Sequence, residues 1–202
     1  VFATERVDAL SREWRTLAVL GGVPFPSVIS GGWVVLQGTG AATSARVAAG
    51  PGGSSRPALL MDRIDGEPVS DAGELLAGLG GLLGALDDAG IAHGDLKPEH
   101  FVRGADGALR LLDLGLALPR LSRETSGGTP RYLPLGDADL GTARERDLLA
   151  AGLVLAELAE PALRDVPALL AAARRATGIP FAMEIQALVH ACPSLRRLPG
   201  AE

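Results

Sequence analysis

The sequence is poor in aromatic residues, which make up 3% of the chain, and it contains a single cysteine, Cys192. One cysteine cannot form an internal disulfide, and we expect a buried structural thiol rather than a nucleophile. Neither the paired Cys or His spacing of zinc sites nor the nucleophile-elbow pattern of Ser/His/Asp hydrolases occurs. The sequence therefore gives no support to zinc or serine-hydrolase chemistry.

Long apolar runs are also lacking. None reaches the ~20 residues that span a bilayer, and the leucine-rich stretch Leu75–Leu86 is short and interrupted by glycines. The net charge of −5 gives no reason to expect binding to nucleic acid or a membrane surface. The first residues do not resemble a signal peptide, so we expect a cytoplasmic protein. With 202 residues, the chain can bury a sizeable core.

The most informative stretch is His93–Phe101, followed by Asp113-Leu-Gly115. Asp95 and Lys97 lie on a loop closed by proline, and the preceding pattern predicts a short strand that ends at Asp113. Phosphoryl transfer needs a carboxylate to orient the attacking hydroxyl, a cation near the phosphate and a second carboxylate for magnesium. The simpler alternative is that such aspartates only cap tight turns.

Together these two motifs resemble the catalytic loop and the metal-binding Asp-Phe-Gly of protein kinases. The resemblance implies that Asp95 is the catalytic base, Lys97 the cation that steadies the phosphate, and Asp113 a magnesium ligand. Two positions depart from the family. Gly94 replaces the usual arginine, and His100 stands at the second metal position, where the family has asparagine. Imidazole is a poor ligand for a hard cation such as Mg²⁺.

The first part of the chain has apolar residues at helical spacing, which predicts a helix that ends at Gly21-Gly22. By resemblance it is the kinase C-helix, with Glu13 at the ion-pairing position. The plainer alternative is a solvated glutamate. Val1-Phe2 resembles the end of the preceding strand. We therefore expect the glycine-rich loop and the ATP-binding lysine of the family to be missing from this sequence.

A strand-like segment, Trp33–Gln37, precedes a run rich in Gly, Ala, Ser and Pro over residues 38–56. That composition is typical of a flexible loop, so we expect a long connection between strands. Its start, Gly38–Ser44, could cradle a phosphate. However, no Gly-Lys-Ser/Thr follows, so it is not a P-loop.

The apolar run that ends at Met61 predicts a buried strand. It resembles the kinase hinge, in which Met61 would be the gatekeeper and the backbones of Asp62 and Ile64 would meet adenine. Val102 would then form the floor beneath adenine. An ordinary core strand and turn would need the same sequence, so this alternative stays open.

Further helices are predicted over residues 71–89, 143–158, 165–177 and 182–191. The glycines of the first of these suggest close packing between helices. Asp147 lies in the first half of the apolar helix predicted over residues 143–158. By resemblance it anchors the backbone of the catalytic loop, and helix capping is the plainer alternative. Gly104-Ala-Asp-Gly107 predicts a hairpin turn.

The segment Thr129-Pro-Arg-Tyr132 resembles the end of a kinase activation segment, in which Thr129 would bridge Asp95 and Lys97. Leu135 replaces the glutamate that the family uses in an ion pair with arginine. Because Gly94 removes the arginine that would read a phosphate, we expect no switching by phosphorylation. The alternative is an ordinary Ser/Gly loop.

These observations predict an α+β, protein kinase-like bilobal fold. Residues 1–66 would form a truncated small β lobe, and residues 67–202 a mainly helical large lobe. The expected function is ATP- and Mg²⁺-dependent phosphoryl transfer to Ser/Thr hydroxyls of proteins. One alternative is an inactive pseudokinase that acts as a binding or scaffold module. Another is a small-molecule phosphotransferase.

Overall fold

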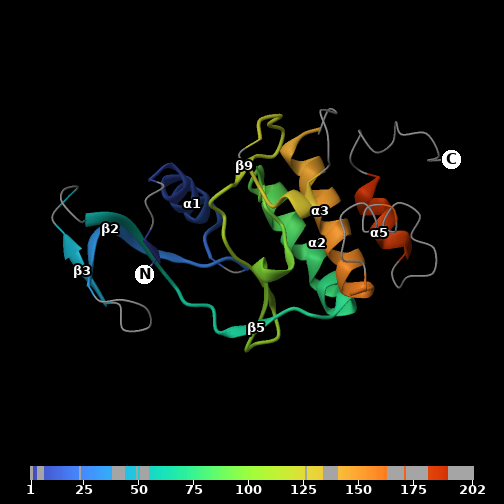
Figure 1. The fold of residues 1–202 in the computed structure, drawn as a ribbon, viewed down its shortest axis with the longest axis horizontal. Coiled ribbons are helices and arrows are strands. Elements are labelled where there is room, and N and C mark those ends of the chain that lie inside the picture. Colours follow the sequence, from blue (N-terminus) through green and yellow to red (C-terminus); the bar gives the residue numbers. More distant parts are fainter. Residues whose placement is uncertain are drawn as a thin grey trace.

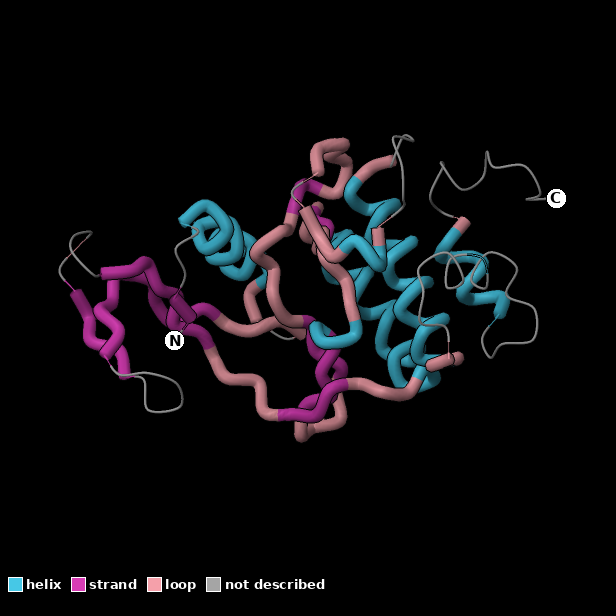
Figure 2. Tube along the Cα trace, viewed as in Figure 1, coloured by secondary structure: helices cyan, strands magenta, loops and turns pink. Residues whose placement is uncertain are grey.

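The described part of the chain is α+β, with four α-helices and three antiparallel sheets (Figures 1 and 2). A four-stranded sheet and α1 lie at one end, and α2, α3 and α5 lie at the other (Figure 1). The division at residue 66 stays a prediction. The computed structural model describes residues 2–3, 7–22, 24–37, 44–48, 50, 55–125, 127–133, 141–162, 171 and 182–190.

The larger sheet has the order β1-β4-β2-β3. Its strands are β1 (Phe2–Ala3), β2 (Val28–Gln37), β3 (Ser44–Ala48) and β4 (Ser55–Met61). The expectation of a continuous loop over residues 38–56 is wrong, because this range contains β3 and the start of β4. β3 pairs with β2 from Trp33↔Ala48 to Gln37↔Ser44. Pairing with a long neighbouring strand satisfies its backbone groups, which composition alone does not reveal.

Helix α1 (Val7–Leu20) packs on this sheet with Leu10, Glu13 and Leu17 buried. A Cβ placed on Gly31 of β2 would lie 2.6 Å from the Trp14 ring, so the helix approaches the strand closely. The helix ends at Gly21, which has a φ of +71°, as the sequence predicts.

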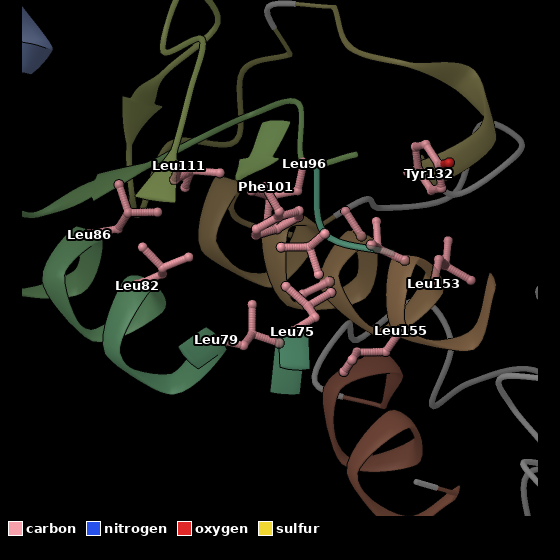
Figure 3. Packing of buried hydrophobic residues seen from close by; sticks show 14 of the residues in the cluster. Leu75, Leu79, Leu82, Leu86, Leu96, Phe101, Leu111, Tyr132, Leu153 and Leu155 are labelled. Atoms are coloured by element: carbon pink, nitrogen blue, oxygen red, sulfur yellow. The ribbon is translucent and has the colours of Figure 1, made fainter. Parts of the chain in front are cut away.

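The other end of the molecule is built on α2 (Ala72–Asp88), α3 (Ala143–Ala159) and α5 (Ala182–Val189). The Asp71 side chain caps α2 by accepting a hydrogen bond from the Glu74 amide, 2.8 Å away. Thr142 and Glu145 form a capping box on α3. Figure 3 shows the apolar core between these elements, with labelled residues Leu75, Leu79, Leu82, Leu86, Leu96, Phe101, Leu111, Tyr132, Leu153 and Leu155.

The glycines of α2 do not share one role. A Cβ on Gly78 would lie 2.7 Å from Leu109, so this glycine allows close packing on β8. Nothing lies within 4 Å of a Cβ placed on Gly80, Gly81 or Gly84. Among these four glycines, only Gly78 permits a close approach, and its neighbour is a strand rather than the helix expected from the sequence.

Two small sheets position the loops that carry Asp95 and Asp113. In the first, β5 (Gly66–Pro68) pairs with β7 (Phe101–Gly104), which forms the expected hairpin with β8 (Leu109–Leu111). In the second, β6 (Ile91–Ala92) pairs with β9 (Leu118–Pro119). This second pairing brings the segment after Asp113 back beside the strand that precedes His93.

Three sequence expectations concern residues outside the described ranges. They are the helix over residues 165–177, of which residue 171 alone is described, the buried thiol of Cys192, and Leu135. Within the described ranges, no helix combines the length and the apolar composition that crossing a membrane requires.

Candidate functional site

The loop that carries Asp95 is anchored by Asp147 of α3. The backbone amides of His93 and Gly94 donate to the Asp147 carboxylate over 2.5 and 2.9 Å. Burial raises the pKa of Asp147 to about 6, although these two hydrogen bonds act in the opposite direction. Since Thr142 is the cap of α3, Asp147 is not the helix cap and instead fixes the start of the loop.

His93 lies inside the loop and is fully buried. Its Nδ1 accepts a hydrogen bond from the Asp95 amide (3.2 Å), and its Nε2 lies 2.8 Å from the Leu112 carbonyl. This geometry assigns the ring proton to Nε2, because a carbonyl can only accept. Burial lowers the pKa of His93 to about 4, so the ring is neutral and ties the Asp95 loop to the segment of Asp113.

Asp113 is brought to the same place by the β7–β8 hairpin. The Leu112 amide donates to the His100 carbonyl (3.0 Å), which extends the hairpin pairing and sets Asp113 beside His100. The His100 Nε2 and the Asp113 Oδ2 are 3.4 Å apart. The hydrogen-bonding interaction with His100 is the main reason why the pKa of Asp113 falls to about 2. The Asp113 side chain is 55% exposed and ionised at neutral pH.

Both oxygens of Asp95 have neighbours. The Thr129 amide donates to Oδ1 over 2.6 Å, and the Lys97 Nζ lies 3.5 Å from Oδ2. The sequence predicts that Thr129 bridges Asp95 and Lys97. In the structure, Thr129 reaches Asp95 through its backbone amide. Asp95, Lys97 and Thr129 are therefore brought together.

Gly94 has a φ of +83°, and a Cβ at this position would lie 2.4 Å from the Leu116 carbonyl oxygen. No side chain fits here unless the backbone after Asp113 moves. Glycine at this position therefore has a steric reason within this chain.

Glu13 of α1 is 6% exposed, so the alternative of a solvated glutamate is wrong. Burial, and to a smaller extent the charge of Asp113, raises its pKa to about 7. A hydrogen bond from the Leu114 amide and the charge of His100 act in the opposite direction. Within the described ranges, no arginine forms an ion pair with Glu13. Lys97 is the one lysine of the sequence and pairs with Asp95.

The hinge-like residues lie elsewhere. Met61 packs against the core at the end of β4, and the Asp62 amide donates to the Ser27 carbonyl (2.9 Å). Asp62 and Ile64 line a groove of about 460 Å³ that includes neither Val102 nor Asp113. Val102 is buried on β7. An adenine site formed by these residues stays a prediction.

One cluster was not anticipated from the sequence. Arg131 forms a two-pronged ion pair with Glu157 of α3 (3.1 and 3.0 Å), and the Tyr132 hydroxyl donates to the same carboxylate (2.6 Å). Burial and this carboxylate raise the pKa of Tyr132. The signal in the sequence was an acidic residue in the apolar second half of this helix, which requires a partner. The cluster holds the segment after Thr129 against α3.

The donor groups decide which cations suit the site. The exposed, ionised carboxylate of Asp113 suits Mg²⁺, whereas His100 presents a ring nitrogen. No group of three or more His, Cys, Asp or Glu side chains able to enclose a metal occurs in the described ranges. A cation here needs further ligands from water or substrate.

Comparison with known protein families adds no assignment, because no family model matches the chain.

Proposed function

We propose that this chain is a protein kinase-like phosphotransferase domain that transfers phosphate from ATP to Ser/Thr hydroxyls of a protein in the cytoplasm. One observation carries the proposal. His100 contacts the Asp95 carbonyl through Nδ1 (2.9 Å) and faces the Asp113 carboxylate through Nε2. The two acidic residues of the motif therefore belong to one centre, although they come from different segments.

The chemistry follows from the contacts of Asp95. Its carboxylate is held by the Thr129 amide and is partly buried, so it is positioned to orient an acceptor hydroxyl and take its proton. Lys97 supplies a positive charge beside it. Magnesium, when bound with ATP at Asp113, would offset the charge of the phosphates.

The proposed fold is the kinase-like bilobal arrangement. The sheet with α1 at one end and the helices at the other support it (Figure 1). The segment from Thr129 to Tyr132 favours a protein acceptor over a small molecule, because it contacts Asp95 at one end and is held on α3 at the other.

A pseudokinase that acts as a binding module is the second candidate, and Glu13 favours it. The glutamate is buried beside Asp113, its pKa is raised to about 7, and within the described residues Lys97 pairs with Asp95 rather than with it. A domain of this kind would bind partners without transferring phosphate.

Nucleotide binding with and without Mg²⁺ tests the proposal. The matched variant is Asp113→Asn, because Asp113 has a φ of 60° and asparagine tolerates this conformation. We expect the chain to bind a non-hydrolysable ATP analogue in the presence of Mg²⁺, and the variant to bind it at least about tenfold more weakly. Binding that needs neither Mg²⁺ nor Asp113, or no binding at all, would favour the pseudokinase.

A further inference from the structure

We infer that His100 and Asp113 form a nitrogen–oxygen half-site for a divalent first-row transition ion, so that this centre prefers ions of the Mn²⁺-to-Zn²⁺ class over Mg²⁺. The inference rests on the proposed function in one respect only, because phosphate oxygens of a nucleotide would supply some of the remaining ligands. The two protein ligands are set by the fold itself.

The orientation of the His100 ring is the first observation. Its Nδ1 lies 2.9 Å from the Asp95 carbonyl, which can only accept, so Nδ1 carries a proton and donates it. Nε2 then points at Asp113. Histidines that bind metals almost always show this arrangement, in which the second ring nitrogen donates to a carbonyl or carboxylate.

The separation of the two ligand atoms is the second observation. The distance from Nε2 to the Asp113 Oδ2 is 3.4 Å. Charge-assisted hydrogen bonds are shorter, at about 2.7–2.9 Å. Two metal–ligand bonds of about 2.1 Å that meet at a tetrahedral angle span about 3.4 Å. A metal ion that binds between Nε2 and the Asp113 Oδ2 needs little movement of either side chain.

Both ligands are held in place before any ion binds. His100 is 6% exposed, and its backbone amide donates to the Lys97 carbonyl (3.0 Å). The Asp113 Oδ1 accepts a hydrogen bond from the Gly115 amide (3.3 Å), which leaves Oδ2 for the ion. Because the Asp113 side chain is 55% exposed, an ion and its other ligands can reach the pair from solvent.

The choice of ion follows from ligand chemistry. A hard cation such as Mg²⁺ prefers oxygen at every position, whereas imidazole nitrogen raises the affinity for first-row transition ions. The histidine at position 100 is therefore the residue that sets the metal preference.

Cobalt(II) is a suitable probe, because nitrogen ligation changes its visible absorption. The experiment titrates the full, nucleotide-free chain with CoCl₂ and in parallel with MgCl₂, following bound metal by equilibrium dialysis. The variants are His100→Asn and Asp113→Asn. The control is His190→Asn, which removes another described histidine at the end of α5. Circular dichroism checks that each variant is folded.

We expect one Co²⁺ per chain with a changed absorption spectrum, and affinity at least about tenfold lower in both site variants. The control should bind Co²⁺ like the unmodified chain, and Mg²⁺ binding should change little in His100→Asn. Equal Co²⁺ affinity in the unmodified chain and both site variants, or no binding by the unmodified chain, would overturn the inference. If His100→Asn does not fold, the Asp113→Asn result decides.

The two proposals can fail separately. If cobalt binding depends on His100 but no phosphoryl transfer occurs with any divalent cation, the proposed function alone is contradicted. If phosphoryl transfer occurs with Mg²⁺ but cobalt does not bind at His100, this inference alone is contradicted.

Discussion

Gly94 shows how one backbone position can exclude a side chain that a motif leads one to expect. Its φ of +83° and the Leu116 carbonyl leave no room for a Cβ. The sequence reveals that arginine is absent here, but the reason lies in a contact with a residue 22 positions away along the chain. Such contacts are invisible to pattern reasoning.

Gly94→Ala should destabilise the protein by about 2–4 kcal/mol. The alanine would have to keep a left-handed backbone conformation, and its Cβ would also overlap with the Leu116 carbonyl. Gly90→Ala is the matched control. Gly90 has a φ of +71°, but nothing lies within 4 Å of its Cβ position, so only the conformational cost of about 1 kcal/mol remains. Urea denaturation measures both. Equal losses in the two variants would contradict the proposed overlap.

Because of Glu13, the stability of the protein is expected to depend on pH. Its folded pKa of about 7 lies above the ordinary value of 4.5, so between these values the folded state binds more protons than the unfolded state. The stability of the unmodified protein therefore falls as pH rises through this window. Glu13→Gln, which stays neutral, should escape this loss and gain about 2 kcal/mol relative to the unmodified chain.

Denaturation of both proteins at about pH 4.5 and about pH 8 separates this effect from general packing changes. A stability difference that is the same at the two pH values would show that Glu13 does not titrate in the folded state within this window.

At the scale of elements, the helices were the most predictable part. Apolar spacing placed α1, α2 and α3 within a few residues of their observed ends, because this signal is local. Strand β3 was missed because its short Ser-Ala-Arg-Val-Ala sequence is defined by pairing with β2. The pair of Arg131 with Glu157 was missed for the same reason, since it joins separate segments.

The glycines of α2 predict opposite effects for the same substitution. Gly81→Ala should stabilise the protein by about 0.5–1 kcal/mol, because alanine favours the helix and the added methyl group meets open space. Gly78→Ala should destabilise it, because its Cβ would lie 2.7 Å from Leu109 of β8.

Thermal unfolding of the two variants checks this contrast between Gly78 and Gly81. If both substitutions stabilise the protein, the close packing of α2 on β8 at Gly78 is incorrect. If both destabilise it, the space around Gly81 is occupied.

At the scale of the whole molecule, the site depends on four separate segments. They bring Glu13, Asp95, Asp113 and Thr129 to one region, and the anchor Asp147 comes from a fifth. The residues Asp95 and Asp113 were singled out in the sequence by the resemblance of their motifs to those of protein kinases. The ring contacts of His100 and the burial of Glu13 could not be predicted, because they depend on how these segments pack.

The most direct test of the central proposal is transfer of labelled phosphate from Mg-ATP to a generic protein substrate and to the chain itself. The assay compares the unmodified chain with Asp113→Asn and repeats both with Mn²⁺. We predict transfer to Ser/Thr residues by the unmodified chain and a loss of at least about a hundredfold in the variant. No transfer by the unmodified chain with either metal, or equal transfer by both proteins, would contradict a phosphotransferase centred on Asp95 and Asp113.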